Sequence, residues 1–455
     1  MLTAVLFFGQ SSVRLTTPAS AVDTPGSPNI VLILTDDQRW DTLWAMPTVQ
    51  SELVDQGIEF VNGFASNPLC CPSRASILTG LYSHSNGVYT NSRNEPYGGF
   101  AAFDDRSTVA TWLHDVGYRT GLFGKYFNGY HTEYVPPGWD RWFATYGGGG
   151  YYDYSAISDG RTVPFGSDRS DYGTAVLARK TVSFINGTEP STPLFAYFAP
   201  HAPHNPATPA PGDGAAFEDL PRWRPDNFNE RDVSDKPAYI QRKQRLDAAE
   251  RRQIDRFRRN QYQSLLAVDR AVGDIVQALD DTDRLSNTLI VFMSDNGKSW
   301  GEHRWHKKVV PYEESIRVPF VVRFDAAIEP RVDENLVVNV DLAPTFAELA
   351  GAAITGLEGR SLVPLFESAD AAWRTEFLLE HMPDGDRSVP TYCGIRSTRY
   401  TYVRYVTGEE ELYDLARDHL QLVNRVRRDR YSDEVRDMRR RLQELCRPRP
   451  PGYSF

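Results

Sequence analysis

Short runs of consecutive apolar residues alternate in this chain with longer stretches whose apolar residues recur every three or four positions. Residues 29–34, Asn-Ile-Val-Leu-Ile-Leu, are typical of a strand buried on both faces of a parallel sheet. From residue 261 onward the recurring positions form one apolar face of a helix. By the same criteria we expect further strands at 119–123, 194–198, 288–293 and 318–324, and further helices at 47–57, 73–78, 107–116 and 344–351. Strands that alternate with helices predict a doubly wound α/β core.

The pattern changes after about residue 370. Residues 391–406 and 411–415 are typical of antiparallel strands, and a last helix has one apolar face made of Val435, Met438, Leu442 and Leu445. We therefore expect an α/β domain over residues 29–370, with a large, mostly parallel sheet between helices, and a smaller α+β subdomain over residues 371–455.

Residues 1–28 precede the first expected strand. They contain an apolar run at 2–8 and Ala19-Ser20-Ala21, which is similar to a signal-peptidase site, but no charged segment precedes the run. Two interpretations stay open: a signal peptide, which implies a secreted or periplasmic protein, or a disordered tail, which leaves a cytoplasmic location open. The sequence contains no run of the roughly 18 apolar residues that a membrane-spanning helix needs.

The composition is that of an ordinary globular protein. The chain has 455 residues, of which 41% are hydrophobic and 24% are charged, and its net charge is −10. The acidic balance argues against nucleic acid or an anionic membrane as the main partner. Four cysteines are too few for a disulfide scaffold, and the sequence does not decide whether Cys393 and Cys446 pair.

Oxygen-rich pairs of residues follow two of the expected buried strands. Asp36-Asp37 follows the first strand, and Asp295-Asn296 follows the strand at 288–293. Because ligands of open α/β sheets bind at the carboxyl ends of the strands, three carboxylates and one amide oxygen are expected to converge there. Such a set suits Ca²⁺, with Mg²⁺ as the second choice. Taken alone, each pair is better explained as a turn or a helix cap, and the metal site is favoured only when the pairs are taken together with the motif at Cys70.

The most specific motif is Cys70-Cys71-Pro72-Ser73-Arg74, which is followed by Leu78-Thr79-Gly80. We expect Pro72 and Ser73 to start a helix, so that its positive end faces Cys70 and favours an anion, while Arg74 adds a fork of donors. The motif resembles the signature of type I, formylglycine-dependent sulfatases. In that family a formylglycine-generating enzyme oxidises the first Cys to an aldehyde, whose hydrate is the nucleophile. The resemblance implies that Cys70 is both nucleophile and metal ligand, beside Asp36, Asp37, Asp295 and Asn296.

Three further segments are similar to family motifs, at residues 124–128, 200–206 and 301–308. Gly124-Lys125-Tyr126-Phe127-Asn128 has Phe127 where many sulfatases have His, and instead resembles the N-acetylglucosamine-6-sulfatase branch. The resemblance implies that Lys125, His204 and Lys308 join Arg74 in catalysis, and that Asn128, His201 and His303 contact the substrate.

The resemblance also implies an overall fold and a substrate. The fold would be alkaline-phosphatase-like, and the reaction would be hydrolysis of a sulfate monoester, with a 6-O-sulfated glucosamine-like sugar as the first choice. Three alternatives stay open: an arylsulfatase, a phosphate or phosphonate ester hydrolase of the alkaline phosphatase superfamily, and a carbohydrate-binding relative without catalysis.

Overall fold

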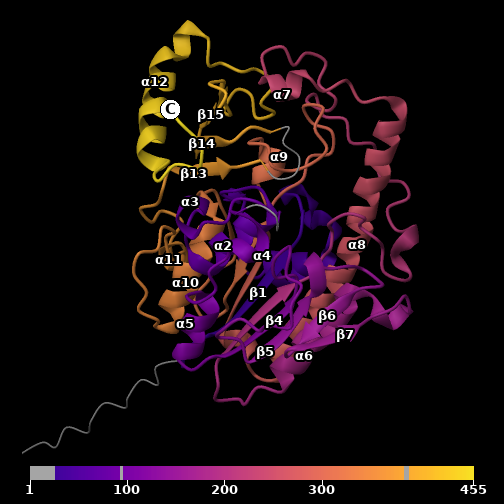
Figure 1. Cartoon of the computed structure of the whole chain (residues 1–455). Helices are drawn as coiled ribbons and strands as arrows, with labels where there is room; N and C mark the ends of the chain where they lie inside the picture. The colour runs from indigo at the N-terminus through magenta and orange to yellow at the C-terminus, as the bar shows by residue number, and fades with distance from the viewer. Residues whose placement is uncertain (1–25, 93–95, 384–388) are drawn as a thin grey trace, which may run out of the picture.

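A ten-stranded mixed sheet occupies the centre of the larger part of the molecule, and a four-stranded sheet forms the smaller part (Figure 1). The computed structural model describes residues 26–92, 96–383 and 389–455, so that almost all of the signal peptide or tail expected at 1–28 lies outside the described residues. The strands of the large sheet are β1 (Asn29–Thr35), β2 (Ile58–Phe60), β4 (Arg119–Gly124), β5 (Arg141–Thr145), β6 (Ser155–Ser158), β7 (Arg161–Pro164), β8 (Leu194–Ala199), β9 (Thr288–Ser294), β10 (Phe320–Arg323) and β11 (Arg331–Asp333).

The strand order of the large sheet is β11-β2-β10-β9-β1-β8-β4-β5-β6-β7. Its middle, from β9 through β1, β8 and β4 to β5, is parallel, and antiparallel pairs join β10 to both of its neighbours and β5, β6 and β7 to one another. A two-stranded sheet of β3 (Gly63–Phe64) and β12 (Val337–Val338) lies apart from it. The predicted mostly parallel α/β sheet is therefore confirmed. Strands β6 and β7 extend it with antiparallel pairs at one end, and at the other end β10 runs antiparallel to its neighbours while β2 and β11 pair in parallel.

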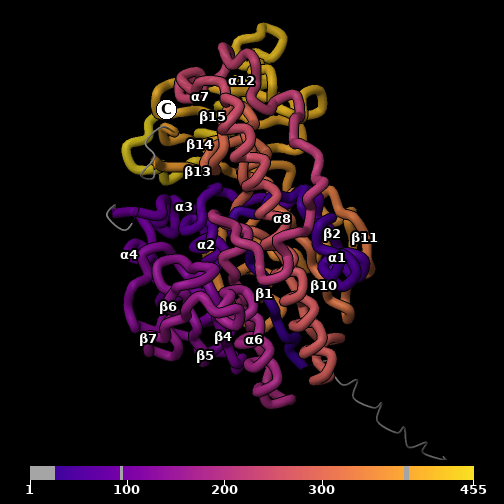
Figure 2. The backbone as a smooth tube through the Cα atoms, turned by 90° about the vertical axis from the view of Figure 1, so that its right-hand side faces the viewer, coloured from indigo at the N-terminus to yellow at the C-terminus, as the bar shows by residue number. Residues whose placement is uncertain are grey.

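Alternation along β1 explains why helices cover both faces of the sheet. Ile30, Leu32 and Leu34 pack on the side of α2 (Cys70–Thr79), α5 (Val109–Asp115) and α10 (Leu342–Ala350). Val31 and Ile33 pack on the side of α6 (Gly173–Asn186) and α8 (Ala248–Asp281), and Figure 2 shows α8 running along most of the molecule. Since successive side chains of a strand point to opposite faces, a continuous apolar run requires this three-layer arrangement.

The C-terminal part has its own sheet and helix. Its antiparallel strands are β13 (Glu376–His381), β14 (Tyr392–Ser397), β15 (Tyr400–Tyr405) and β16 (Glu410–Asp414). One face packs on α12 (Ser432–Leu445), where a disulfide joins Cys393 to Cys446. The other face shares a core with the large part, in which the rings of Phe64 and Phe377 lie 4.9 Å apart. The division of the chain near residue 370 stays a proposal.

Several expected boundaries differ from the structure. Helix α2 starts at Cys70 rather than at residue 73, because Pro72 is tolerated within the first helical turn. Helix α8 starts at Ala248 rather than at residue 261. The helix expected at 47–57 is only α1 (Pro47–Val49) and a π-helical turn, Gln50–Val54. The remaining short helices are α3 (Ser83–Asn86), α4 (Gly99–Ala102), α7 (Ala238–Gln241), α9 (Glu313–Ile316) and α11 (Val363–Glu367).

Within the described residues, no helix is both long enough and apolar enough to cross a membrane.

Candidate active site

Four neighbouring parallel strands bring most of the candidate residues to one edge of the large sheet. Strands β9, β1, β8 and β4 are adjacent, and each is followed by one of the motifs. The register pairs Thr35 with Ser294, so that the residues after β1 and after β9 start side by side. The histidine loop follows β8, and the loop of Lys125 follows β4. The sheet topology therefore assembles the site at the carboxyl ends of the strands, where ligands of such sheets bind.

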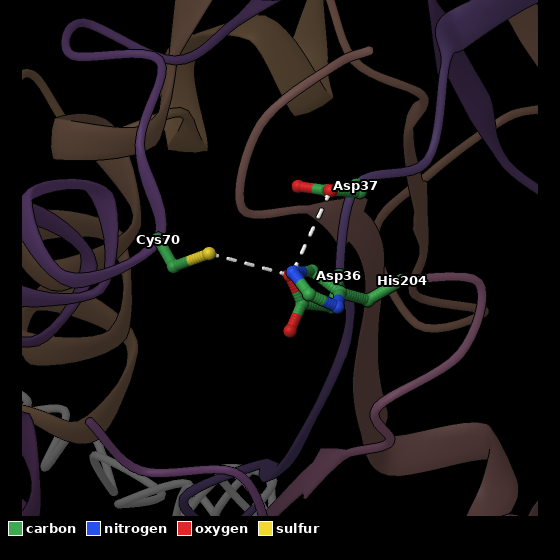
Figure 3. Close-up of side chains that lie close together, drawn as sticks. All are labelled: Asp36, Asp37, Cys70 and His204. Atoms are coloured by element: carbon green, nitrogen blue, oxygen red, sulfur yellow. Dashed lines mark hydrogen bonds and ion pairs between the residues drawn. The ribbon is translucent and has the colours of Figure 1, made fainter. Parts of the chain in front are cut away.

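Cys70 is the first residue of α2 and points from that helix toward Asp36 (Figure 3). The preceding Leu69 is in an extended conformation, with φ −150° and ψ 142°, which sets the start of the helix. The Cys70 thiol donates to Asp36 Oδ1 at 3.4 Å, and Lys308 Nζ donates to Cys70 Sγ at 2.8 Å. The side chain is fully buried among charged groups, which is unusual for a cysteine that only fills space.

Four cations neutralise the three carboxylates of this cluster. Lys125 Nζ lies 2.5 Å from Asp36 Oδ2, and Lys308 Nζ lies 2.5 Å from Asp37 Oδ1. Arg74 donates from Nε to Asp295 Oδ2 at 2.9 Å and from Nη1 to the Lys125 carbonyl at 2.8 Å. All of these side chains are buried or nearly so, with exposed fractions of 12% or less. The cluster can therefore accept an anion without leaving a cation exposed to bulk water.

The fourth cation, Lys298, was not predicted from the sequence. Lys298 Nζ lies 3.1 Å from Asp37 Oδ2, whereas Lys308 pairs with the other oxygen, Oδ1. Its position two residues after Asn296, at the end of a buried strand, was the signal that could have identified it.

The environment makes the Cys70 thiol a poor nucleophile. Burial, together with Asp295 and Asp36, raises the pKa of Cys70 to about 12, despite the nearby lysines. For Asp36, burial works against ionisation, but Lys125, His204 and Lys308 outweigh it and hold the pKa below its ordinary value. The Asp36 carboxylate is thus charged and the thiol is protonated at neutral pH, so that the unmodified sulfur is not prepared to attack an ester.

His204 and His201 both lie beside the aspartates. His204 Nδ1 lies 2.9 Å from the Asn205 carbonyl, which requires a proton on Nδ1, and Nε2 then faces Asp37 Oδ2 at 3.7 Å. Burial lowers the pKa of His204 to about 4. His201 Nδ1 lies 3.2 Å from the Gly148 carbonyl and 3.9 Å from Asp36 Oδ2. Of the two histidines, therefore, only His204 has a ring nitrogen that faces the cluster and has no carbonyl partner.

Two predicted substrate contacts lie elsewhere in the structure. His303 is fully buried. Its Nδ1 lies 2.6 Å from Glu230 Oε2, and its ring centroid lies 4.3 Å from that of Tyr312, with the two rings tilted by 37°. We therefore leave His303 out of the residues proposed to contact substrate, because its neighbours already enclose it. Asn128 lies beside Cys71, whose Sγ accepts from the Asn128 backbone N–H at 3.2 Å. Asn128 thus supports the segment of Cys70 rather than the carboxylate cluster.

The oxygen donors fit a hard cation. Ligand atoms of Asp36, Asp37, Cys70 and His204 all lie within 4.8 Å of one another. Asn296 donates its Nδ2 to Asp37 Oδ1 at 2.7 Å, and its Oδ1 is a buried acceptor for which the described residues provide no hydrogen-bond partner. A buried orphan oxygen next to two carboxylates is the arrangement expected where a cation binds. His204 is the member of this group that sequence reasoning did not assign to the metal.

A pocket of about 660 Å³ opens onto the cluster. Asp37, His204 and Lys308 are among the residues that line it, whereas Cys70 is fully buried and does not line it. One wall comes from the start of α8 and the loop before it, and the residues along it include Leu246, Glu250, Gln253, Ile254, Arg256, Phe257 and Asn260. Apolar and amide side chains along one wall are the mixture that binds the face and the hydroxyl groups of a small polar ligand.

Known proteins share both the sequence and the fold. The family described as sulfatase matches residues 28–352, and the family described as N-sulphoglucosamine sulphohydrolase, C-terminal, matches residues 301–448. The N-acetylglucosamine-6-sulfatase of Homo sapiens is 33% identical over 80% of this chain and 69% of its own length. The extracellular sulfatase SULF-1 homolog of Drosophila melanogaster is 34% identical over 78% of this chain. The chain spans 33% of that relative and 52% of the related Caenorhabditis elegans protein.

Solved structures are also similar to this chain. A structure described as a complex with its substrate D-glucosamine-2-N,6-O-disulfate has a TM-score of 0.82 and 25% identity, and the match covers 92% of this chain and 97% of that one. The phosphonate monoester hydrolase of Agrobacterium radiobacter shares the fold alone, with a TM-score of 0.72 at 22% identity over 92% and 95% of the two chains. Given the match over residues 28–352 and the relatives at 33% identity, this chain belongs to the sulfatase family.

Proposed function

We propose that this protein removes sulfate from a sulfated sugar, with 6-O-sulfated glucosamine as the preferred unit, and that Cys70 acts after its conversion to formylglycine. The observation that carries the proposal is the burial of Cys70 at the start of α2, in contact with both Asp36 and Lys308. The N-acetylglucosamine-6-sulfatases among the relatives and the disulfated glucosamine bound by a structural neighbour support the choice of sugar.

Each charged group in the cluster has a proposed part in the reaction. Lys125, Lys308 and Arg74 would offset the charge of the sulfate oxygens, as cations placed in advance do for a developing anion. Asp36, Asp37, Asp295 and Asn296 would hold a cation together with residue 70, and Ca²⁺ bound there would polarise the sulfate group. The hydrated aldehyde at position 70 would supply an oxygen nucleophile whose second hydroxyl group allows the sulfate to be released.

His204 is proposed to hold the proton for the leaving alcohol. Its Nε2 faces the cluster, whereas its Nδ1 is occupied by the Asn205 carbonyl. Burial lowers its pKa to about 4 in the free protein. The carboxylates of Asp36 and Asp37, together with a bound sulfate group, would favour the charged imidazolium of His204. Protonation of His204 would therefore accompany substrate binding.

Maturation and location follow from the same proposal. Conversion of Cys70 requires a formylglycine-generating enzyme as a partner, and relatives named extracellular sulfatases support secretion.

The proposed function is tested by comparing the rates at which the protein hydrolyses sulfate, phosphate and phosphonate esters. The protein would be co-expressed with a formylglycine-generating enzyme and assayed with N-acetylglucosamine 6-sulfate, 4-nitrophenyl sulfate, and a phosphate and a phosphonate ester of 4-nitrophenol. We expect the highest kcat/KM on the sugar sulfate and no turnover by Cys70→Ala. Preference for the phosphorus esters would instead support the phosphate or phosphonate hydrolase alternative. Sugar binding without turnover by the matured protein would support the binding-only alternative.

A further inference from the structure

A buried glutamine in α8 connects three of the loops that carry the active site. The amide nitrogen of Gln261 donates to the carbonyl of Asp37 at 3.2 Å and to the carbonyl of Pro203 at 3.2 Å. Its amide oxygen accepts a hydrogen bond of 2.6 Å from the indole N–H of Trp300. The loops that follow β1, β8 and β9 therefore meet at one side chain.

Each contact of this glutamine lies at or beside a residue of the charged cluster. Asp37 is one of the oxygen donors of the cluster, and Pro203 directly precedes His204. Trp300 lies two residues after Lys298, whose Nζ pairs with Asp37 Oδ2. The glutamine itself is only 2% exposed and does not line the catalytic pocket. Any effect that it has on the reaction must therefore pass through the residues that it holds.

The amide group of Gln261 has only one orientation that satisfies its neighbours. Its nitrogen has two N–H groups, which are enough for the two carbonyls, and its oxygen meets a donor. A rotated amide would place its oxygen against two carbonyls and its N–H groups against the indole N–H of Trp300. Because the side chain is buried, such unsatisfied contacts are costly, and the amide fixes the three loops in one arrangement.

The backbone of Asp37 is the part of the cluster that most needs this support. Its φ is 63°, in the left-handed region where residues other than glycine are uncommon. Residues stay in that region when their surroundings hold them there. Gln261 holds the Asp37 carbonyl, and the Asp37 N–H donates to Asp295 Oδ1 at 3.3 Å. The direction of the Asp37 carboxylate therefore depends on a hydrogen bond from α8.

The contact with Pro203 extends the same support to the histidine loop. His204 Nε2 lies 3.7 Å from Asp37 Oδ2, and the carbonyls of Asp37 and Pro203 are held by one nitrogen atom. The spacing between the imidazole and the carboxylate is thus set by a single residue of α8. A misplacement of about 1 Å between reacting groups can cost about 10²-fold in rate.

We propose that Gln261 is a positioning residue, which sets the spacing between Asp37, which would bind the cation, and His204, which would protonate the leaving alcohol. This inference deepens the proposed function and rests on it for the roles of Asp37 and His204. The effect of Gln261 on cation binding can be measured without catalysis.

Helix α8 also provides a matched control. Gln263 is buried, and its amide nitrogen donates to the carbonyls of Gly214 and Ala216 at 2.7 and 2.8 Å, in a loop that holds none of the site residues. Gln261→Met and Gln263→Met therefore each remove a buried amide that bonds two carbonyls. A structural role alone predicts similar effects of the two changes, whereas a positioning role predicts that the site changes only in Gln261→Met.

The experiment measures Ca²⁺ affinity by calorimetry on unconverted protein, and kcat and KM for N-acetylglucosamine 6-sulfate on matured protein. In Gln261→Met we expect Ca²⁺ binding about 10-fold to 100-fold weaker, as for other residues that orient metal ligands, and a similar fall in kcat with KM changed by less than about threefold. Gln261→Glu keeps the size and the acceptor for Trp300 but turns an oxygen toward the two carbonyls, and we expect the same losses. Gln263→Met should bind Ca²⁺ and turn over as the parent does.

Equal changes in Gln261→Met and Gln263→Met would overturn the inference and leave the proposed function standing. Failure of both Gln261 variants to fold, while Gln263→Met folds, would assign Gln261 to stability alone and would also overturn it. If the matured parent releases no sulfate from any ester, the proposed function is rejected, and a Ca²⁺ affinity lowered only in the Gln261 variants would still support the positioning of Asp37.

Discussion

At the scale of single residues, the site contains a thiol that its surroundings keep inactive. Burial and the nearby carboxylates raise the pKa of Cys70 to about 12, while Lys308 and Asp36 hold its sulfur in place. A cysteine protease or a thiolate metal site would require the opposite shift. The chemistry is better explained if position 70 carries an oxygen nucleophile, and the surrounding cations then act on the ester rather than on the sulfur.

Arg74→Lys tests whether the forked donor matters. Arg74 bonds both Asp295 and the Lys125 carbonyl, and a lysine cannot make both contacts with that geometry. We expect kcat/KM on N-acetylglucosamine 6-sulfate to fall by roughly 10²–10³-fold, the range seen when one positioned donor is removed. Arg106→Lys is the control, since Arg106 is exposed and pairs with the exposed Asp104. Activity within twofold of the parent would exclude this part for Arg74.

Metal removal tests the oxygen cluster. Asp36 and Asp37 lie side by side, and Asn296 Oδ1 has no hydrogen-bond partner among the described residues. We expect dialysis against EGTA to abolish sulfate release and to lower the melting temperature, and we expect Ca²⁺ to restore both better than Mg²⁺. Full activity in metal-free protein, or recovery with Zn²⁺ or Mn²⁺ alone, would contradict the proposed site.

At the scale of elements, α3 joins the large part of the molecule to β13. His84 Nδ1 lies 2.9 Å from Glu380 Oε1 on β13, and its Nε2 lies 3.1 Å from Glu358 Oε1. Burial opposes a charge on the ring, but the two glutamates outweigh burial and raise the pKa of His84 to about 10. The ring is almost enclosed, with 4% of its side chain exposed, so that solvent screens its pair with the buried Glu380 little.

The pH dependence of His84→Gln follows from that raised pKa. Protonation of His84 stabilises the folded state fully below the unfolded pKa of roughly 6.5, and this contribution is lost as the pH rises toward the folded value. We expect the variant to lose about 2 kcal/mol of unfolding free energy at pH 6, and progressively less as the pH approaches 10. Urea unfolding of parent and variant across this range gives the difference. A difference that stays constant, or grows with pH, would show that the pair is not ionic.

Some helices and strands could be predicted from their own stretch of sequence, and others could not. β1 and β9 were predictable because strands buried on both faces are continuously apolar. β7 has exposed residues and little apolar signal, so its alternation does not stand out. The start of α8 projects past the sheet and needs no apolar stripe, but its capping box of Asp247 and Glu250 was a signal that could have placed it.

At the scale of the whole molecule, the strand order of the large sheet brings together residues that no local sequence pattern connects. The order β9-β1-β8-β4 brings together Asp295, Asp36, His204 and Lys125, which the sequence separates by many residues. The motif resemblance anticipated this group. It could not anticipate that His303 is enclosed by Glu230 and Tyr312, because those neighbours come from other segments of the chain. Nor could it show that Arg256 of α8 lines the catalytic pocket.

The most direct test of the account is the mass of the peptide that contains Cys70. Protein co-expressed with a formylglycine-generating enzyme would be digested, and the peptide compared with that from protein made without the enzyme. The account predicts a decrease in mass equal to the exchange of the thiol for an aldehyde, at Cys70 and not at the adjacent Cys71. A Cys70 that remains an alkylatable thiol, in protein that nevertheless releases sulfate, would contradict it.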